Sequence, residues 1–106
     1  MKTLTGKIIL VTGASRGIGA AIAQKLASEG ATVVVNYAGN KEAADKTVAA
    51  IEALGAQAMA IQADVSKSDE VKKMFDAVIA QYGRIDVLVN NAGILLYKLI
   101  KDTTDE

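Results

Sequence analysis

The chain has 106 residues, with 12 Lys and Arg against 12 Asp and Glu, and contains no His, Cys, Pro or Trp. The missing residue types exclude a thiol nucleophile, a Ser-His-Asp triad and a zinc site of the usual ligands, so we expect no metal. The zero net charge indicates neither a nucleic-acid nor a membrane partner. No apolar run approaches the about 20 residues of a membrane-spanning helix, and Met1–Lys7 lacks a secretory signal, so we expect a cytoplasmic domain.

Apolar runs alternate with amphipathic stretches along the chain. The runs 7–11, 31–35, 57–62 and 85–89 predict strands, and the first is apolar enough to be covered on both faces. Residues 36–40 are expected to form the turn after the second strand. Helices are predicted at 18–29, at 41–54 with Asn40 as N-cap, and at 69–82 with Ser68 as N-cap. The buried face of the third helix is expected to contain Val71, Met74, Phe75, Val78, Ile79 and Tyr82.

The resulting βαβαβαβ order predicts the fold class. Strands that alternate with helices of this length are typical of an α/β protein with a parallel sheet and right-handed crossovers. We expect a three-layer, doubly wound parallel sheet with strand order 3-2-1-4. The fourth strand would then be an edge whose apolar residues need a cover.

The glycine-rich turn 12–19, between the first strand and the first helix, is the most informative stretch. Gly13 can turn out of the strand, Gly17 can let the backbone approach a phosphate, and Gly19 can let the helix pack tightly on the sheet. With Ser15 and Ile18, these residues predict an anion site at a helix N-terminus. A tight turn that binds no ligand is the alternative.

The end of the second strand bears on the choice of cofactor. NAD-selective sites normally place a carboxylate there, where it accepts the ribose hydroxyls, but this sequence has Asn36, which we expect to contact the cofactor at this place. Since Arg16 in the glycine turn could pair with a 2′-phosphate, NADP(H) is favoured over NAD(H). The alternative for Arg16 is a solvated surface cation.

Three motifs together resemble the short-chain dehydrogenase/reductase family: the glycine turn, Asp64-Val65 after the third strand, and the stretch 90–93 (Asn-Asn-Ala-Gly) after the fourth. The chain is most similar to 3-oxoacyl-[acyl-carrier-protein] reductases and glucose dehydrogenase-like members. The resemblance implies that the glycine turn holds the pyrophosphate, that Asp64 bonds the adenine amino group, and that Val65 packs on the ring. It also implies that Asn91, Ala92 and Gly93 line the cofactor cleft. Turn or capping chemistry is the alternative for Asp64, and turn chemistry for the asparagines.

The resemblance also implies which residues are missing. The family reduces a carbonyl with Tyr, Lys, Ser and Asn that follow the 90–93 motif, so no catalytic residue is assigned. Tyr97 and Lys101 have a suggestive spacing, but Tyr37 and Lys41 share it, and we interpret both as accidental. Thr103 and Glu106 resemble a capping box with no helix after it. We therefore expect one incomplete Rossmann-type dinucleotide-binding unit over 1–106, the N-terminal half of a longer reductase.

The leading functional hypothesis is the cofactor-binding part of an NADP(H)-dependent oxidoreductase that acts on a carbonyl or alcohol substrate. The family resemblance implies a homo-oligomer, commonly a tetramer. The alternatives are a non-catalytic nucleotide-binding module and an assembly module that pairs its fourth strand with another chain. A flavodoxin-like or receiver domain is disfavoured, because it would not need three glycines before the first helix.

Overall fold

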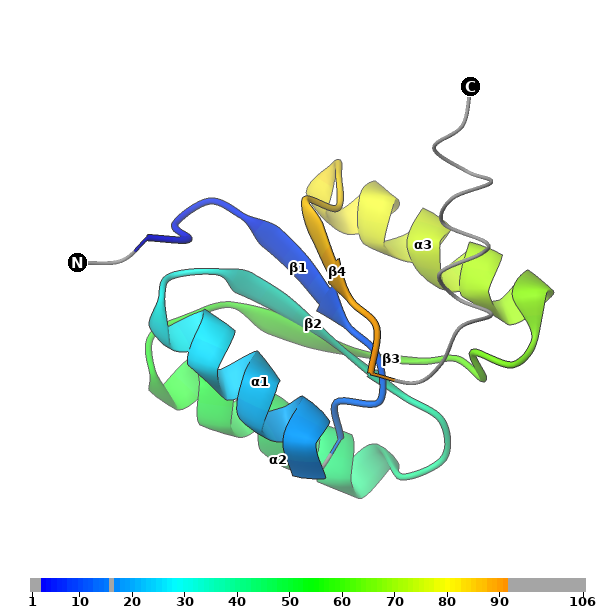
Figure 1. Cartoon of the computed structure of the whole chain (residues 1–106), viewed down its shortest axis with the longest axis horizontal. Helices are drawn as coiled ribbons and strands as arrows, with labels where there is room; N and C mark the ends of the chain where they lie inside the picture. Colours follow the sequence, from blue (N-terminus) through cyan, green and yellow to red (C-terminus); the bar gives the residue numbers. More distant parts are fainter. Residues whose placement is uncertain (1–2, 16, 92–106) are drawn as a thin grey trace.

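The computed structural model describes residues 3–15 and 17–91 (Figure 1). Within these residues four strands and three helices alternate, as the sequence predicts. In chain order they are β1 (Ile8–Val11), α1 (Gly17–Ser28), β2 (Thr32–Tyr37), α2 (Lys41–Ala53), β3 (Ala58–Gln62), α3 (Ser68–Tyr82) and β4 (Val87–Val89).

The four strands form one parallel sheet in the order β3-β2-β1-β4, which confirms the predicted topology. The first strand is central: Ile9 lies opposite Val33 of β2 on one side and Val87 of β4 on the other. Because all strands run in the same direction, their carboxyl ends meet at one edge of the sheet. The loops that leave this edge are the place where open α/β sheets bind ligands.

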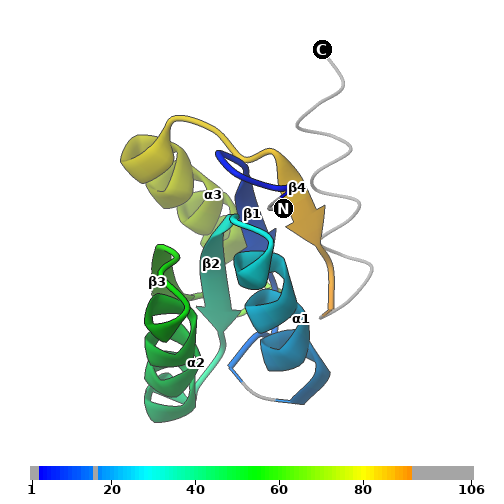
Figure 2. The ribbon, with the colours of Figure 1, turned by 90° about the vertical axis from the view of Figure 1, so that its left-hand side faces the viewer.

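Helices cover both faces of the sheet and make the three predicted layers. Figures 1 and 2 show α1 and α2 on one face and α3 on the other. Side chains of β1 alternate between two buried clusters, with Ile9 and Val11 on the α1/α2 side and Ile8 and Leu10 on the α3 side. This explains why the strand is apolar at every position.

The structure corrects the predicted end of the second strand. Asn36 and Tyr37 belong to β2 rather than to a turn, because they pair with Ile61 and Gln62 of β3. Both residues are buried, and the turn begins only at Ala38. The local sequence suggests a turn, but the neighbouring strand extends the ladder by two residues.

Two predictions about α3 are also wrong. Ser68 is the first residue of the helix and not its cap; Lys67 occupies the cap position, with no side-chain capping bond. Ile79 is 48% exposed, although Val71, Met74 and Val78 are buried. At 3.6 residues per turn, these three lie on the stripe that faces the sheet, and Ile79 lies one position further around the helix.

At the amino edge of the sheet, Asp86 joins β4 to β1. Its Oδ2 accepts a hydrogen bond from the Ile8 N–H (2.8 Å), and its own N–H donates to the Ile8 carbonyl (2.8 Å). Arg84 Nε donates to both carboxylate oxygens at 3.0 and 2.9 Å. The Arg84 hydrogen bonds, followed by the one from Ile8, hold the pKa of Asp86 below its ordinary value.

Within residues 3–15 and 17–91, no helix has both the length and the apolar character that a bilayer crossing requires.

Candidate dinucleotide site

The glycine turn leaves the carboxyl end of β1 and leads into α1. Gly13 and Gly17 have φ angles of +62° and +67°, in the left-handed region that non-glycine residues rarely adopt. A Cβ added at Gly17 would meet nothing within 4 Å, so glycine is required there for its backbone angle and not for space. The Gly17 backbone is therefore open to the approach of a ligand group.

Gly19 is required for space, as the sequence predicts. It is buried on α1, and a Cβ there would overlap the Gly13 carbonyl oxygen and lie 2.9 Å from Asn91 Nδ2. The first turn of α1 thus packs directly on the glycine turn and on the loop after β4. This packing fixes the first turn of α1, and the N-terminus of a helix has the N–H groups and the positive dipole end that suit an anion.

Asn36 is a buried anchor of the same turn. It is 2% exposed, its Oδ1 accepts from the Gly13 N–H (3.1 Å), and its backbone carbonyl accepts from the Ala14 N–H (2.9 Å). Its Nδ2 donates to the carbonyls of Ala63 (3.2 Å) and Ile61 (3.4 Å). The side chain is therefore engaged within the protein and not placed at an open strand end.

Thr47 on α2 and Asn91 after β4 hold the turn from two other directions. Thr47 is 4% exposed, and its hydroxyl lies 3.0 Å from the Ser15 carbonyl and 3.3 Å from the Ala43 carbonyl. Asn91 Nδ2 donates to the Gly13 carbonyl at 3.3 Å. The Thr47 contact was not predicted from the sequence. Its available signal is a polar residue on the apolar stripe of α2, three residues after Ala44 and four before Ile51.

The end of β4 is tied to the beginning of the glycine turn. The Asn91 N–H donates to Thr12 Oγ1 (2.8 Å), and the Thr12 N–H donates to the Val89 carbonyl (3.1 Å). Thr12 is fully buried. The predicted turn chemistry of the asparagine motif is thus present at Asn91, beside the position where a ligand of the glycine turn would lie.

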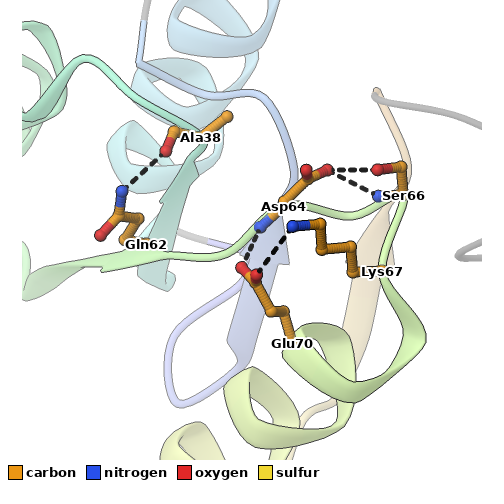
Figure 3. Close-up of polar contacts among 6 residues, drawn as sticks. All are labelled: Ala38, Gln62, Asp64, Ser66, Lys67 and Glu70. Atoms are coloured by element: carbon orange, nitrogen blue, oxygen red, sulfur yellow. Dashed lines mark hydrogen bonds and ion pairs between the residues drawn. The ribbon is translucent and has the colours of Figure 1, made fainter.

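Asp64 and Val65 follow β3 at the same edge of the sheet, and both are half-buried. Asp64 Oδ1 accepts from Ser66 Oγ (2.6 Å) and from the Ser66 N–H (3.0 Å), as Figure 3 shows. The side-chain bond from Ser66, and then the backbone bond, lower the pKa of Asp64, so the carboxylate is ionised at neutral pH. The alternative of turn chemistry is thus realised here, and it fixes a charged acceptor at the sheet edge.

Glu70 on α3 supports this loop, a role that was not predicted from the sequence. Its Oε1 accepts from the Asp64 N–H at 2.8 Å, and its Oε2 lies 4.0 Å from Lys67 Nζ (Figure 3). Glu70 is the third residue of α3, where a capping-box carboxylate normally reaches back to the cap residue. Here it reaches further back, to Asp64. Glu70 therefore fastens the strand-to-helix loop without a capping serine.

The predicted site residues thus fall into two groups. Those that the structure describes lie on the loops, on a strand end or in the first turn of α1, at the carboxyl edge of the sheet: Gly13, Ser15, Gly17, Ile18, Gly19, Asn36, Asp64, Val65 and Asn91. The others lie outside the described residues: Arg16, Ala92 and Gly93, with the Tyr97/Lys101 pair and the Thr103/Glu106 capping box. The first group combines backbone N–H groups suited to an anion with a carboxylate that can accept from an amino group.

This arrangement defines a Rossmann-type dinucleotide-binding fold. The family model described as short chain dehydrogenase matches residues 7–106. The chain is 52% identical over 106 residues to an uncharacterized oxidoreductase of Methylorubrum extorquens. It is 59% identical over 88 residues, or 83% of its length, to a 3-oxoacyl-[acyl-carrier-protein] reductase of Staphylococcus epidermidis. The chain belongs to the short-chain dehydrogenase family, as its motifs predict.

Solved structures of short-chain dehydrogenases have the same fold as this chain. A short-chain dehydrogenase from Burkholderia cenocepacia in complex with NADP matches 86% of the chain at 54% identity, with a TM-score of 0.81. A metagenomic short-chain oxidoreductase in complex with NADP matches 86% of the chain at 47% identity, with a TM-score of 0.80. The chain spans 43% of the Methylorubrum protein, 36% of the Staphylococcus protein and 37% of the Burkholderia chain.

Proposed function

We propose that this chain is the dinucleotide-binding part of an NADP(H)-dependent oxidoreductase that transfers hydride between nicotinamide and a carbonyl or alcohol carbon. The observation that carries the proposal is the meeting of the glycine turn, the N-terminus of α1 and the Asp64 carboxylate at one sheet edge. The residues present fit such a cofactor, because the Gly17 backbone faces open space and Gly19 brings the helix N-terminus against the turn. The NADP in the Burkholderia structure supports the choice of cofactor.

Within this proposal, the residues of the chain bind and orient the cofactor. Gly13, Ser15, Gly17 and Ile18 would contact the pyrophosphate, and Arg16 would pair with the 2′-phosphate. Asp64 would accept from the adenine amino group and Val65 would pack on the ring, while Asn91, Ala92 and Gly93 would line the cleft. The nicotinamide supplies the hydride chemistry when bound. No residue of the chain is assigned a proton-transfer role.

For the substrate, we propose a 3-oxoacyl-type carbonyl compound. The supporting observation is the 59% identity to the Staphylococcus reductase over 88 residues. A reductase of this kind would convert a ketone to a secondary alcohol, and the catalytic Tyr, Lys and Ser implied by the family resemblance would lie outside the residues assigned above.

We propose a cytoplasmic location, which fractionation of the source cells tests.

The test is a titration of the full-length protein with NADP⁺ and NAD⁺ by calorimetry. We expect Arg16→Ala to weaken NADP⁺ binding about tenfold or more, since a charge-assisted hydrogen bond to phosphate is lost, and to leave NAD⁺ binding unchanged. Lys25→Ala is the matched control, because Lys25 lies in the last turn of α1 with a side chain 76% exposed. A wild-type protein that binds neither dinucleotide would overturn the proposed function.

A second candidate function is assembly. Val87 of β4 is 41% exposed and Ile79 of α3 is 48% exposed, and the sheet ends at β4 within the described residues. An apolar strand edge of this kind favours pairing with another segment or chain. We therefore also propose a homo-oligomer, tested by light scattering. A monomer over the whole micromolar range, in a protein that still binds dinucleotide, would exclude assembly.

A further inference from the structure

Asn36 occupies an unusual place for an amide side chain, at the buried junction of three parallel strands. Val34, two residues earlier, belongs to the apolar cluster on the α3 side of the sheet, and alternation places Asn36 on the same face. From there its side chain reaches Gly13 after β1 and Ala63 after β3. A buried polar group in such a position is stable only when its hydrogen-bonding groups are satisfied.

The two segments that Asn36 joins are the two halves of the proposed dinucleotide site. Gly13 begins the turn proposed to hold the pyrophosphate, and Asn36 accepts from its N–H at 3.1 Å. Ala63 directly precedes Asp64, the proposed adenine acceptor, and Asn36 donates to its carbonyl at 3.2 Å. A single 2%-exposed side chain therefore bridges both halves.

We propose that Asn36 is a positioning residue, which couples the glycine turn to the Asp64 loop and does not itself contact the dinucleotide. The inference rests on the proposed function, and it gives Asn36 a different role from the one expected from its sequence position at the end of a strand. Preorganised spacing raises affinity, because the free protein need not order the two loops when it binds. Loss of Asn36 should therefore weaken the binding of any dinucleotide, whether or not it carries a 2′-phosphate.

The chemistry of the junction requires a group that accepts on one side and donates on the other. Asn36→Ala leaves the Gly13 N–H and the Ala63 carbonyl without this partner. Asn36→Asp keeps the acceptor, but its second oxygen would face the carbonyls of Ala63 and Ile61. Protonation of that oxygen restores a donor, and burial favours the protonated form. Low pH should thus restore the dinucleotide affinity of the aspartate variant relative to wild type and leave the relative affinity of the alanine variant unchanged.

Within residues 3–15 and 17–91, the hydrogen-bond partners of the Asn36 side chain are backbone groups of Gly13, Ile61 and Ala63. In the adjoining loop, Asp64 is engaged by Ser66, and Glu70 of α3 is engaged by the Asp64 N–H and by Lys67. The other ionisable side chains of α3 are Asp69, Lys72, Lys73, Asp76 and Tyr82. All of these groups are present in the wild type and in both variants. The ratio of variant to wild-type dissociation constants therefore isolates position 36.

The experiment measures NAD⁺ and NADP⁺ dissociation constants of the full-length wild type, Asn36→Ala and Asn36→Asp at pH 8 and pH 5.5. We expect both variants to bind both dinucleotides about tenfold or more weakly at pH 8, with the NADP⁺/NAD⁺ preference unchanged. At pH 5.5 the aspartate variant should recover a large part of the loss, and the alanine variant none. Val78→Ala controls for a general loss of stability, since Val78 is buried on α3, far along the helix from its N-terminus.

Three outcomes would contradict the inference. Wild-type affinity in both variants would overturn the positioning role of Asn36 and leave the proposed function standing. A loss of affinity confined to NADP⁺ would do the same, because it would indicate a direct contact at the ribose phosphate. Wild-type protein that binds neither dinucleotide would overturn the proposed function and this inference with it. If Asn36→Ala does not fold, Asn36→Ser serves instead, because one short hydroxyl cannot satisfy both Gly13 and Ala63, and the same criteria apply.

Discussion

At the scale of single residues, Gly19 offers the sharpest test of the glycine turn. A methyl group there would overlap the Gly13 carbonyl oxygen and crowd Asn91 Nδ2 at 2.9 Å. The carbonyl is main chain and cannot rotate away, so the turn itself has to shift. We expect Gly19→Ala to lower the free energy of unfolding by about 1–3 kcal/mol, measured by urea denaturation, and to abolish dinucleotide binding.

Two other glycines provide matched controls for this variant. Gly17→Ala meets nothing within 4 Å but forces alanine to a φ of +67°, so we expect a loss of about 1–2 kcal/mol from backbone strain alone. Gly39→Ala also meets nothing within 4 Å, and Gly39 is exposed, so its stability should stay within about 0.5 kcal/mol of wild type. Equal losses in Gly19→Ala and Gly39→Ala would contradict the packing role of Gly19.

The same residues show what the sequence can predict about a site. The need for glycine at positions 13, 17 and 19 follows from local spacing, because turn, phosphate approach and helix packing are fixed by neighbours in the chain. The anchors of the turn are different. Asn36 lies 23 residues from Gly13, and Thr47 lies 32 residues from Ser15, so only the assembled sheet and helices bring these pairs together. No local pattern reveals such contacts.

At the scale of elements, the N-cap of α2 is a contact that the sequence predicts and the structure confirms. Asn40 Oδ1 accepts from the Ala43 N–H at 2.9 Å, satisfying one of the free donors at the helix start. Asn40→Ala should cost about 1 kcal/mol of unfolding free energy, which urea denaturation measures. Ser68→Ala is the control, because Ser68 was predicted to cap α3 and does not. A loss of 1 kcal/mol in the control as well would show that the assay reports something other than capping.

Element order was predictable, and element ends were not. Alternating apolar runs and glycine stops predict the seven elements of the described residues, because each run must be buried and Gly30, Gly55 and Gly83 follow the ends of the three helices. The ends depend on tertiary partners. Pairing with β3 extends β2 to Tyr37, and Glu70 replaces the expected serine at the start of α3. Both corrections come from contacts between elements that sequence periodicity does not encode.

At the scale of the whole molecule, hydrogen bonds join the beginning of the described chain to the segment that leads into β4. Asp86 bonds both polar groups of the Ile8 backbone, 78 residues earlier, and Arg84 Nη2 donates to the Gly6 carbonyl at 2.6 Å. These bonds lie at the amino edge of the sheet, opposite the proposed site. The sequence predicts the pairing of β1 with β4 but gives no indication that a carboxylate fastens it.

Asp86 also makes stability depend on pH in a defined direction. Because its pKa is lowered in the folded protein by Arg84 and Ile8, its contribution is fully present above the unfolded-state value of about 4 and is lost as pH falls through the folded-state value. Asp86→Asn should therefore be destabilised relative to wild type at pH 7, and the difference should narrow below about pH 4. Guanidinium unfolding of both proteins at pH 7, 5 and 3 measures this difference in the free energy of unfolding.

The control is Asp76→Asn, which removes only an exposed ion pair with Lys72 and should differ from wild type by less than about 0.5 kcal/mol at all three pH values. A difference for Asp86→Asn that stays constant from pH 7 to pH 3 would show that shape at this position matters and its charge does not.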